Sequence, residues 1–212
     1  MLATKVNETA SWSEHESPQV LTDIFLDSKS VVIWNRPPKE SISHYFSKVF
    51  SSLGMGINGI YSIETMKHEL QKSLPDCTGI DDVIEDIHLL SDMVTCLFNC
   101  QHVGMRLVPL KSAMCPSFHM DNIPVRLVNT YLGSGTEWLP VETLCPPPAN
   151  KQLKQTKFGM YYDENHIQQM NEFDVGLLKG KAWQDHEELA AVHRSCQLQT
   201  DEARVLLTLD PM

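Results

Sequence analysis

Three residues of this 212-residue chain could together bind a metal ion: His119, Asp121 and His193. In an extended segment, residues two apart point to the same side, so His119 and Asp121 present an imidazole and a carboxylate in one direction. His193, delivered by a distant strand, would complete a face of two histidines and one carboxylate, which leaves coordination positions open and suits Fe(II) and oxygen chemistry. The alternative is a structural cluster of hydrogen-bonded side chains.

Arg204 follows His193 by 11 positions and lies in a run of β-forming residues. An arginine there could hold a carboxylate through two parallel hydrogen bonds, although an ordinary ion pair is the other interpretation. A His-x-Asp pair, a distal histidine and a basic residue on the last strand resemble the pattern of the Fe(II)/2-oxoglutarate-dependent oxygenases. The resemblance implies Fe(II) as cofactor and 2-oxoglutarate as a cosubstrate that Arg204 binds.

Other residues near this pattern have two interpretations each. Cys115 could be a fourth ligand, and a thiolate would favour zinc and close the site; otherwise it is a buried thiol. Tyr131 and Asn129 share strand parity with Asp121 if no bulge intervenes. We therefore predict that they line the pocket and hydrogen-bond a bound acid, although a core tyrosine is the common alternative.

Two further functions stay open on the residues alone. One is a cupin-like zinc-binding protein, with Cys115 as fourth ligand, that stores, senses or passes on metal without turnover. The other is a metal hydrolase, in which zinc lowers the pKa of its bound water to about 7 and Glu137 acts as the base.

The elements that must position these residues change in type along the chain. Apolar residues recur at helical spacing over about 38–53 and 80–100, and more weakly from Ser62 to Leu74. A short β-branched run at Ser30 to Trp34 precedes them, and after residue 103 the pattern changes to short β-rich runs between turn clusters. These runs are Gly104 to Leu110, Pro124 to Tyr131, Phe173 to Lys179, Glu188 to His193 and Ala203 to Leu209.

Helices first and strands afterwards predict an α+β protein, with a double-stranded β-helix (jelly-roll, cupin-like) core and helices against its outside. We expect a single domain over residues 1–212. Within it we expect a polar arm at 1–20, a mainly helical buttress at 30–103 and the core with the metal site at 104–212.

Composition excludes several classes of protein. A 42% hydrophobic share with 21% charged residues is that of a folded globular chain. The formal net charge of −10 repels phosphate backbones and anionic lipids, so we expect no nucleic-acid partner and no membrane association. The first residues are neither basic nor strongly apolar, and the 6 cysteines contain no Cys-x-x-Cys pair, so we expect reduced thiols and a cytoplasmic protein.

Longer motifs resemble one family over roughly residues 30–211. Cys-Pro-x-Phe-His-x-Asp-Asn at 115–122, Gly-Thr-Glu-Trp-Leu at 135–139 and Leu-Thr-Leu-Asp-Pro at 207–211 are similar to those of the bacterial DUF1826 proteins. The resemblance implies a fold and a metal site but no substrate, and a functional link to zinc-homeostasis proteins. One departure is Cys196, which follows His193-Arg194-Ser195 where a proline is expected.

Overall fold

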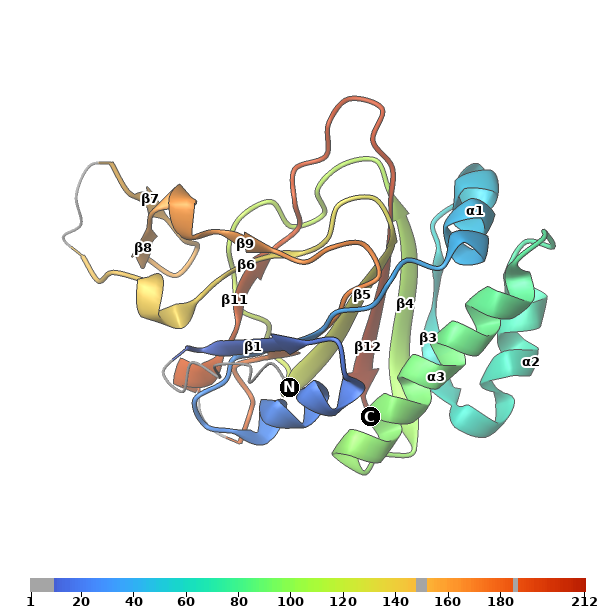
Figure 1. Cartoon of the computed structure of the whole chain (residues 1–212), viewed down its shortest axis with the longest axis horizontal. Helices are drawn as coiled ribbons and strands as arrows, with labels where there is room; N and C mark the ends of the chain where they lie inside the picture. Colours follow the sequence, from blue (N-terminus) through green and yellow to red (C-terminus); the bar gives the residue numbers. More distant parts are fainter. Residues whose placement is uncertain (1–9, 148–151, 185–186) are drawn as a thin grey trace, which may run out of the picture.

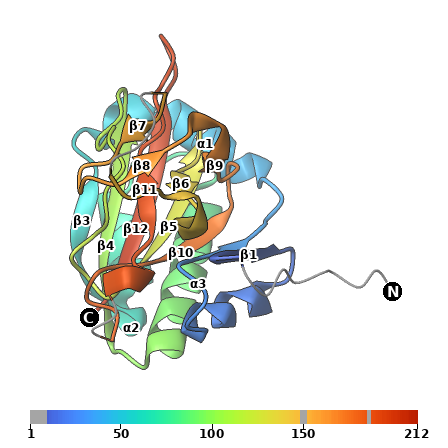
Figure 2. The ribbon, with the colours of Figure 1, turned by 90° about the vertical axis from the view of Figure 1, so that its left-hand side faces the viewer.

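The computed structural model describes residues 10–147, 152–184 and 187–212. A large sheet forms the centre, with helices along one face and a small sheet against the other (Figures 1 and 2). The helices are α1 (Glu40–Val49), α2 (Ile63–Ser73) and α3 (Ile80–Phe98), and the 3-10 helices are η1 (Pro18–Phe25), η2 (Phe50–Leu53), η3 (Val141–Thr143), η4 (Glu164–His166) and η5 (Glu187–Leu189). The strands are β1 (Trp12–His15), β2 (Val31–Trp34), β3 (Ile57–Ser62), β4 (His102–Leu110), β5 (Val125–Leu132), β6 (Glu137–Leu139), β7 (Lys154–Gln155), β8 (Tyr161–Tyr162), β9 (Gln168–Gln169), β10 (Val175–Lys179), β11 (Val192–Arg194) and β12 (Arg204–Pro211).

Within the described residues, the large sheet has seven strands in the order β1-β2-β10-β5-β12-β4-β3. Its neighbours pair antiparallel except β1 and β2, which are parallel. The small sheet has the order β11-β6-β9, and β7 and β8 form a separate hairpin. The prediction of an α+β protein is therefore confirmed.

Helix α3 shows why the first half of the chain packs where it does. Gly79 caps its N-terminus in the left-handed region at φ 98°, and Asn99 caps its C-terminus in the same region at φ 49°. Its apolar residues recur every three or four positions, so Val83, Ile87 and Leu90 are fully buried on one side. That side joins the main hydrophobic cluster with the helix-facing residues of the sheet, and each buried side chain contributes about 1.5–3 kcal/mol.

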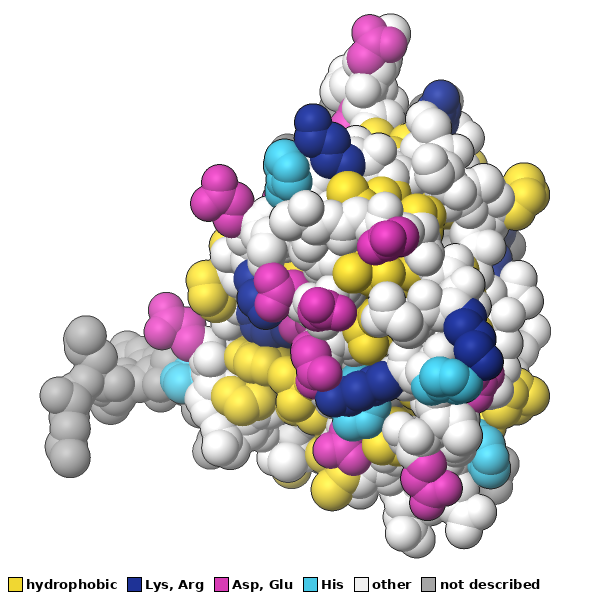
Figure 3. Space-filling model, turned by 90° about the vertical axis from the view of Figure 1, so that its right-hand side faces the viewer, with side chains coloured by type: hydrophobic (Ala, Val, Ile, Leu, Met, Phe, Trp, Pro, Cys, Tyr) yellow, Lys and Arg dark blue, Asp and Glu magenta, His cyan; other side chains and the backbone are white. Residues whose placement is uncertain are grey.

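The outward face of the helix layer is mixed in character. Figure 3 shows charged side chains of both signs interspersed with hydrophobic ones. Exposed ion pairs cross between elements there, with Lys39 2.7 Å from Asp82 and Lys67 2.6 Å from Glu85. Such pairs add little stability in water, so packing beneath them holds the helices. None of the helices in the described part of the chain has the length and apolar character needed to cross a bilayer.

Parts of the domain prediction are wrong. Residues 12–15, inside the predicted polar arm, form β1, and residues 57–62, inside the predicted helical buttress, form the edge strand β3. The sheet therefore extends into the first half of the chain, because strand pairing supplied partners that local periodicity does not show. The predicted strand from Glu188 begins instead with η5, and β11 covers only Val192–Arg194. Residues 1–9 of the predicted arm lie outside the described residues.

Candidate metal centre

His119 and His193 lie directly opposite each other at the free edge of β11. The amide of each donates to the carbonyl oxygen of the other at 3.0 Å, which makes them one antiparallel pair. Side chains of such a pair point to the same side of the sheet. Their ring centroids are 4.6 Å apart, so the pairing of two segments far apart in sequence brings the imidazoles together.

The backbone also orients both rings. Nδ1 of His119 lies 3.0 Å from the Ser117 carbonyl oxygen, and Nδ1 of His193 lies 3.1 Å from that of Ala191. Each Nδ1 can therefore donate to a carbonyl, which leaves the lone pair on Nε2, the state of a metal-binding histidine. Burial lowers the pKa of His193 to about 4, so this ring is neutral at neutral pH.

Asp121 places its carboxylate between the two rings. Oδ1 lies 3.6 Å from Nε2 of His119, and Oδ2 lies 3.6 Å from Nε2 of His193. These separations are too long for hydrogen bonds, but they suit donors arranged around an ion about 2.0–2.2 Å from each. The ligand atoms of the three residues lie within 4.8 Å of one another.

Close backbone packing holds the segment that carries Asp121. The Lys181 amide donates to the Asp121 carbonyl oxygen at 2.8 Å, and the Gly180 amide donates to that of Pro124 at 2.8 Å. A Cβ at position 180 would lie 1.9 Å from the Ile123 carbonyl oxygen. Only glycine allows this approach, so the glycine turn after β10 fixes the backbone next to the carboxylate.

The residues next to His119 and His193 in the chain point to the opposite face of the small sheet. Phe118 and Val192 are buried in a cluster with Tyr162 and Leu139, on the outer side of the small sheet. Arg194 lies over the Phe118 ring at 4.3 Å and pairs with Glu137 at 2.5 Å. Glu137 thus points away from the His193 side chain, because adjacent residues of a strand face opposite sides. The alternative in which Glu137 is the base of a metal hydrolase therefore has no support from this geometry.

Arg204 is 1% exposed and begins β12. Its Nη2 donates to Oγ1 of Thr130 at 3.1 Å and of Thr136 at 2.9 Å, while Nε and Nη1 have no partner among the described residues. Burial lowers the pKa of Arg204, and no described carboxylate lies within ion-pair distance of it. Burying part of a guanidinium without partners costs several kcal/mol, so this geometry is suited to an anion that supplies acceptors.

The guanidinium and the histidines share one interior space. Thr136, which contacts Arg204, precedes Trp138 by two residues, and Trp138 pairs with His193 across β6 and β11. Arg204 therefore contacts the segment that leads into β6, two residues before the position that pairs with His193. Nε1 of Trp138 and Oγ1 of Thr208 are also buried and unpartnered within the described residues.

Tyr131 and Asn129 do not line this space, and the prediction that they do is wrong. The Tyr131 hydroxyl donates to Oδ2 of Asp86 at 2.7 Å, and its ring stacks on Phe46 in the helix-side core. Asn129 donates to the carbonyl oxygen of Phe173 at 2.8 Å. The parity argument failed because a bend at residues 122–124 separates Asp121 from β5. Alternation holds only within a continuous strand.

Cys115 lies near the histidine strands but outside the cluster. Its carbonyl oxygen accepts the Ser195 amide at 2.9 Å. Among the described residues, the ligand atoms that lie within 4.8 Å of one another come from His119, Asp121 and His193, without the Cys115 thiol. The structure thus offers three ligands and leaves the predicted fourth apart.

Arg126 is a site residue whose role sequence reasoning missed. Its Nη1 donates to Oδ2 of Asp121 at 2.7 Å, and its remaining donors bind Asp210. That Arg126 and Thr130 both face the interior follows from the two-residue period of β5, once the strand's start at Val125 is known.

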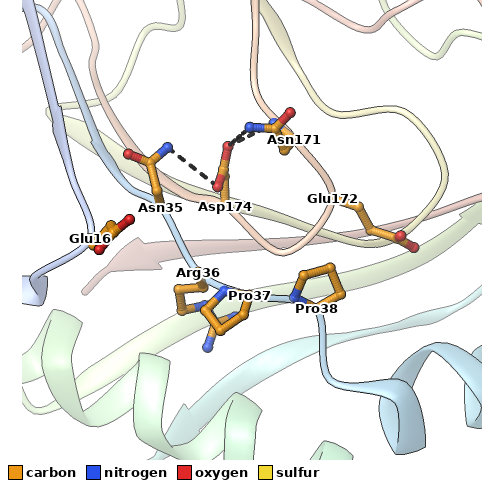
Figure 4. Close-up of a pocket in the computed structure, with 8 residues that line it drawn as sticks. All are labelled: Glu16, Asn35, Arg36, Pro37, Pro38, Asn171, Glu172 and Asp174. Carbon is orange, nitrogen blue, oxygen red and sulfur yellow. Dashed lines mark hydrogen bonds between the residues drawn. The ribbon is translucent and has the colours of Figure 1, made fainter.

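A separate cavity of about 700 Å³ lies beside the loop that joins β2 to α1 (Figure 4). Asn35 and Asp174 lie next to each other in its lining, where Nδ2 of Asn35 donates to Oδ1 of Asp174 at 3.5 Å. Arg36 lines the cavity, but its guanidinium is bound to both carboxylate oxygens of Asp86. No residue of the His119 cluster lines this cavity.

Residues 15–210 match the family described as "Protein of unknown function (DUF1826)". The chain belongs to this family. Its DUF1826 match covers both histidines, Asp121 and Arg204, which confirms the family resemblance seen in the motifs. No curated protein matches the chain.

Solved structures that include oxygenases are similar to this DUF1826 chain at low sequence identity. A full-length Neurospora crassa protein in complex with alpha-KG and 5-formyluracil has a TM-score of 0.49 and 10% identity, over 86% of this chain and 74% of that one. A Pseudomonas putida prolyl-4-hydroxylase has a TM-score of 0.48 and 8% identity, over 91% and 96%. A dioxygenase for auxin oxidation in rice has a TM-score of 0.46 and 12% identity, over 86% and 73%. Likeness at this level does not decide the function.

Proposed function

We propose that this DUF1826 protein is a non-haem Fe(II) oxygenase that uses 2-oxoglutarate. The observation that carries the proposal is the presence, beside the His119, Asp121 and His193 cluster, of a fully buried Arg204 with two nitrogens that have no partner among the described residues. Two imidazoles and one carboxylate suit Fe(II) and leave positions for a chelating acid. Fe(II) with 2-oxoglutarate, when bound, supplies oxygen activation coupled to oxidative decarboxylation.

The strand order supports a double-stranded β-helix as the finer description of the fold. From β4 onward the chain alternates between sheets: β4 in the large one, His119 beside β11, β5 in the large one, then β6 and β9 in the small one. β10 returns to the large sheet, β11 to the small one and β12 to the large one. This winding would place ligands from the small sheet opposite Arg204 on the large sheet.

Each protein group has a definable task in this proposal. Nε2 of His119, Nε2 of His193 and the Asp121 carboxylate would hold the metal. Nη1 of Arg204 would donate to the far carboxylate of 2-oxoglutarate while Nη2 stays bound to Thr130 and Thr136, since a buried guanidinium without a carboxylate partner among the described residues gains most from one. Trp138 and Thr208 would contribute the two other unpartnered donors of the interior.

The direct test is metal content and turnover. Protein purified without oxygen is expected to carry iron by elemental analysis, or to bind added Fe(II) at one equivalent. It is then expected to release CO2 and succinate from 2-oxoglutarate in the presence of oxygen, even without a prime substrate at a slow rate. Tightly held zinc with no decarboxylation would instead favour the non-catalytic zinc-binding function and its link to zinc homeostasis.

Ligand variants connect the metal to the three residues. His119→Ala and His193→Ala are each expected to abolish stoichiometric metal binding, because the two protein ligands that remain in each variant cannot hold the ion firmly. His166→Ala, in η4, is the matched control and is expected to bind normally. Full metal occupancy in both ligand variants would show that the ligands lie elsewhere.

A further inference from the structure

Arg126 joins Asp121 to a second carboxylate, Asp210. Its Nη1 donates to Oδ2 of Asp121 at 2.7 Å, while Nε and Nη2 donate to Oδ1 and Oδ2 of Asp210, each at 2.7 Å. The contact with Asp210 is thus two-pronged, the geometry that fixes a guanidinium most firmly. Arg126 lies near the start of β5 and Asp210 near the end of β12, which pair side by side in the large sheet.

Burial makes this arrangement rigid. The side chains of Arg126, Asp121 and Asp210 are 21%, 17% and 26% exposed. Screening by solvent is therefore limited, and charge-assisted hydrogen bonds of this length hold their partners in place. The Asp121 carboxylate is consequently fixed before any ion arrives, with Oδ1 facing Nε2 of His119.

The charges also balance in a way that suits a cation. Arg126 alone would neutralise Asp121, which would weaken its attraction for a metal ion. Asp210 supplies a second negative charge, so the three groups together keep a net charge of −1. The arginine can then orient Asp121 without cancelling the field that a divalent cation needs.

We propose that Arg126, anchored by Asp210, is a positioning residue that sets the orientation of the Asp121 carboxylate for metal binding. This inference rests on the proposed metal site at His119, Asp121 and His193. For the metal affinity of a variant without Arg126, this inference and simple electrostatics predict opposite changes, because removal of Arg126 leaves two unpaired carboxylates and a more negative site. If orientation dominates, metal affinity falls on removal; if charge alone matters, affinity rises.

The test is a titration of the metal-free protein with Co(II). Calorimetry measures the affinity, and the visible d–d absorption of the bound ion reports its coordination. Arg126→Gln is expected to raise the Co(II) dissociation constant about 10- to 100-fold, the usual effect of losing a partner that orients a ligand, and to change the d–d spectrum. Arg126→Lys keeps one donor and the charge, so it is expected to recover part of the affinity and the wild-type band positions.

Two further variants make the result unambiguous. Asp210→Glu keeps the negative charge but displaces the two-pronged anchor of Arg126, so it is also expected to weaken Co(II) binding, whereas charge alone predicts no change; it serves if Arg126→Gln fails to fold. Arg36→Gln breaks another two-pronged Arg–Asp pair, with Asp86, on the helix side. It controls for general loss of stability and is expected to leave Co(II) affinity unchanged.

The outcomes separate this inference from the proposed function. Unchanged or tighter Co(II) binding with an unchanged spectrum in Arg126→Gln, beside normal wild-type binding, would overturn the positioning role alone. If the wild-type protein binds no Co(II), the metal site itself is wrong, and this inference is wrong with it.

Discussion

At the scale of single residues, the chain provides donors whose usual partners are missing. Arg204 is the clearest case, because an arginine that is 1% exposed has two nitrogens without acceptors among the described residues. A structural arginine is normally saturated by carboxylates or carbonyls, as Arg126 is. The contrast between these two arginines distinguishes a group suited to binding an anion from one that orients a neighbour.

Substitution of Arg204 tests that difference. Arg204→Lys keeps the charge but loses the planar guanidinium, which Thr130 and Thr136 hold through Nη2 so that Nη1 can donate to an anion, so it is expected to weaken 2-oxoglutarate binding by about 1.5–3 kcal/mol, roughly a 10- to 100-fold rise in the dissociation constant. Calorimetry with Co(II)-loaded protein measures it, and the Co(II) affinity should stay nearly constant. Equal 2-oxoglutarate binding by wild type and variant would show that Arg204 is not the anchor.

At the scale of elements, β10 ties the large sheet to η1 through a buried lysine. Nζ of Lys179 donates to the Leu26 carbonyl oxygen at 2.8 Å and lies 5.0 Å from the centre of the Trp183 ring. The side chain is 1% exposed, and burial lowers the pKa of Lys179 to about 8. One carbonyl and one ring only partly replace the water that a charged amine loses.

This pKa predicts a pH dependence of stability. Between about pH 8 and the ordinary lysine pKa of about 10.4, the unfolded chain holds a proton that the folded chain has released, so folding stability rises with pH. Relative to Lys179→Met, the wild-type free energy of unfolding should increase by as much as about 3 kcal/mol over this range. Denaturant titrations from pH 7 to 10.5 measure the difference. Lys67→Met, on the exposed surface, is the control, and a flat difference for Lys179→Met would contradict the prediction.

At the scale of the whole molecule, the candidate site joins segments from distant parts of the sequence. The backbones of His119 and His193, 74 positions apart in the sequence, pair with each other. Asp210 comes from the end of β12, and Gly180, after β10, packs on the segment that carries Asp121. A ligand that bridges these segments binds the folded chain and not the unfolded one. Binding should therefore stabilise the entire fold.

The expected size of that stabilisation can be stated. At a concentration 100 times its dissociation constant, a ligand adds about 2.7 kcal/mol to the free energy of unfolding. For a domain of this size that raises Tm by about 5–10 °C. Thermal melts with Co(II) should show this rise, and 2-oxoglutarate should add a further rise only when the metal is present. Asp121→Ala is expected to show neither, and an equal rise in that variant would place the ion elsewhere.

Local features of the amino-acid sequence were enough to predict the main helices, most strands of the second half of the chain and the family, and to choose candidate ligands. His119, Asp121 and Arg204 could be chosen as candidates because a two-residue spacing and a position in a β-rich run are local features. The main helices could be predicted because an apolar stripe repeats within one segment, as it does in α3.

Whatever depends on contacts between distant segments had to come from the folded chain. Among the described residues, the fold shows that Arg204 lacks a carboxylate partner, that Arg126 is shared by Asp121 and Asp210, and that Cys115 lies outside the cluster. It also reverses the expected roles of Asn129 and Tyr131, because a bend of three residues before β5 resets which side chains face inward. Strand register and partner choice are set by the whole sheet, so no local pattern of residues contains them.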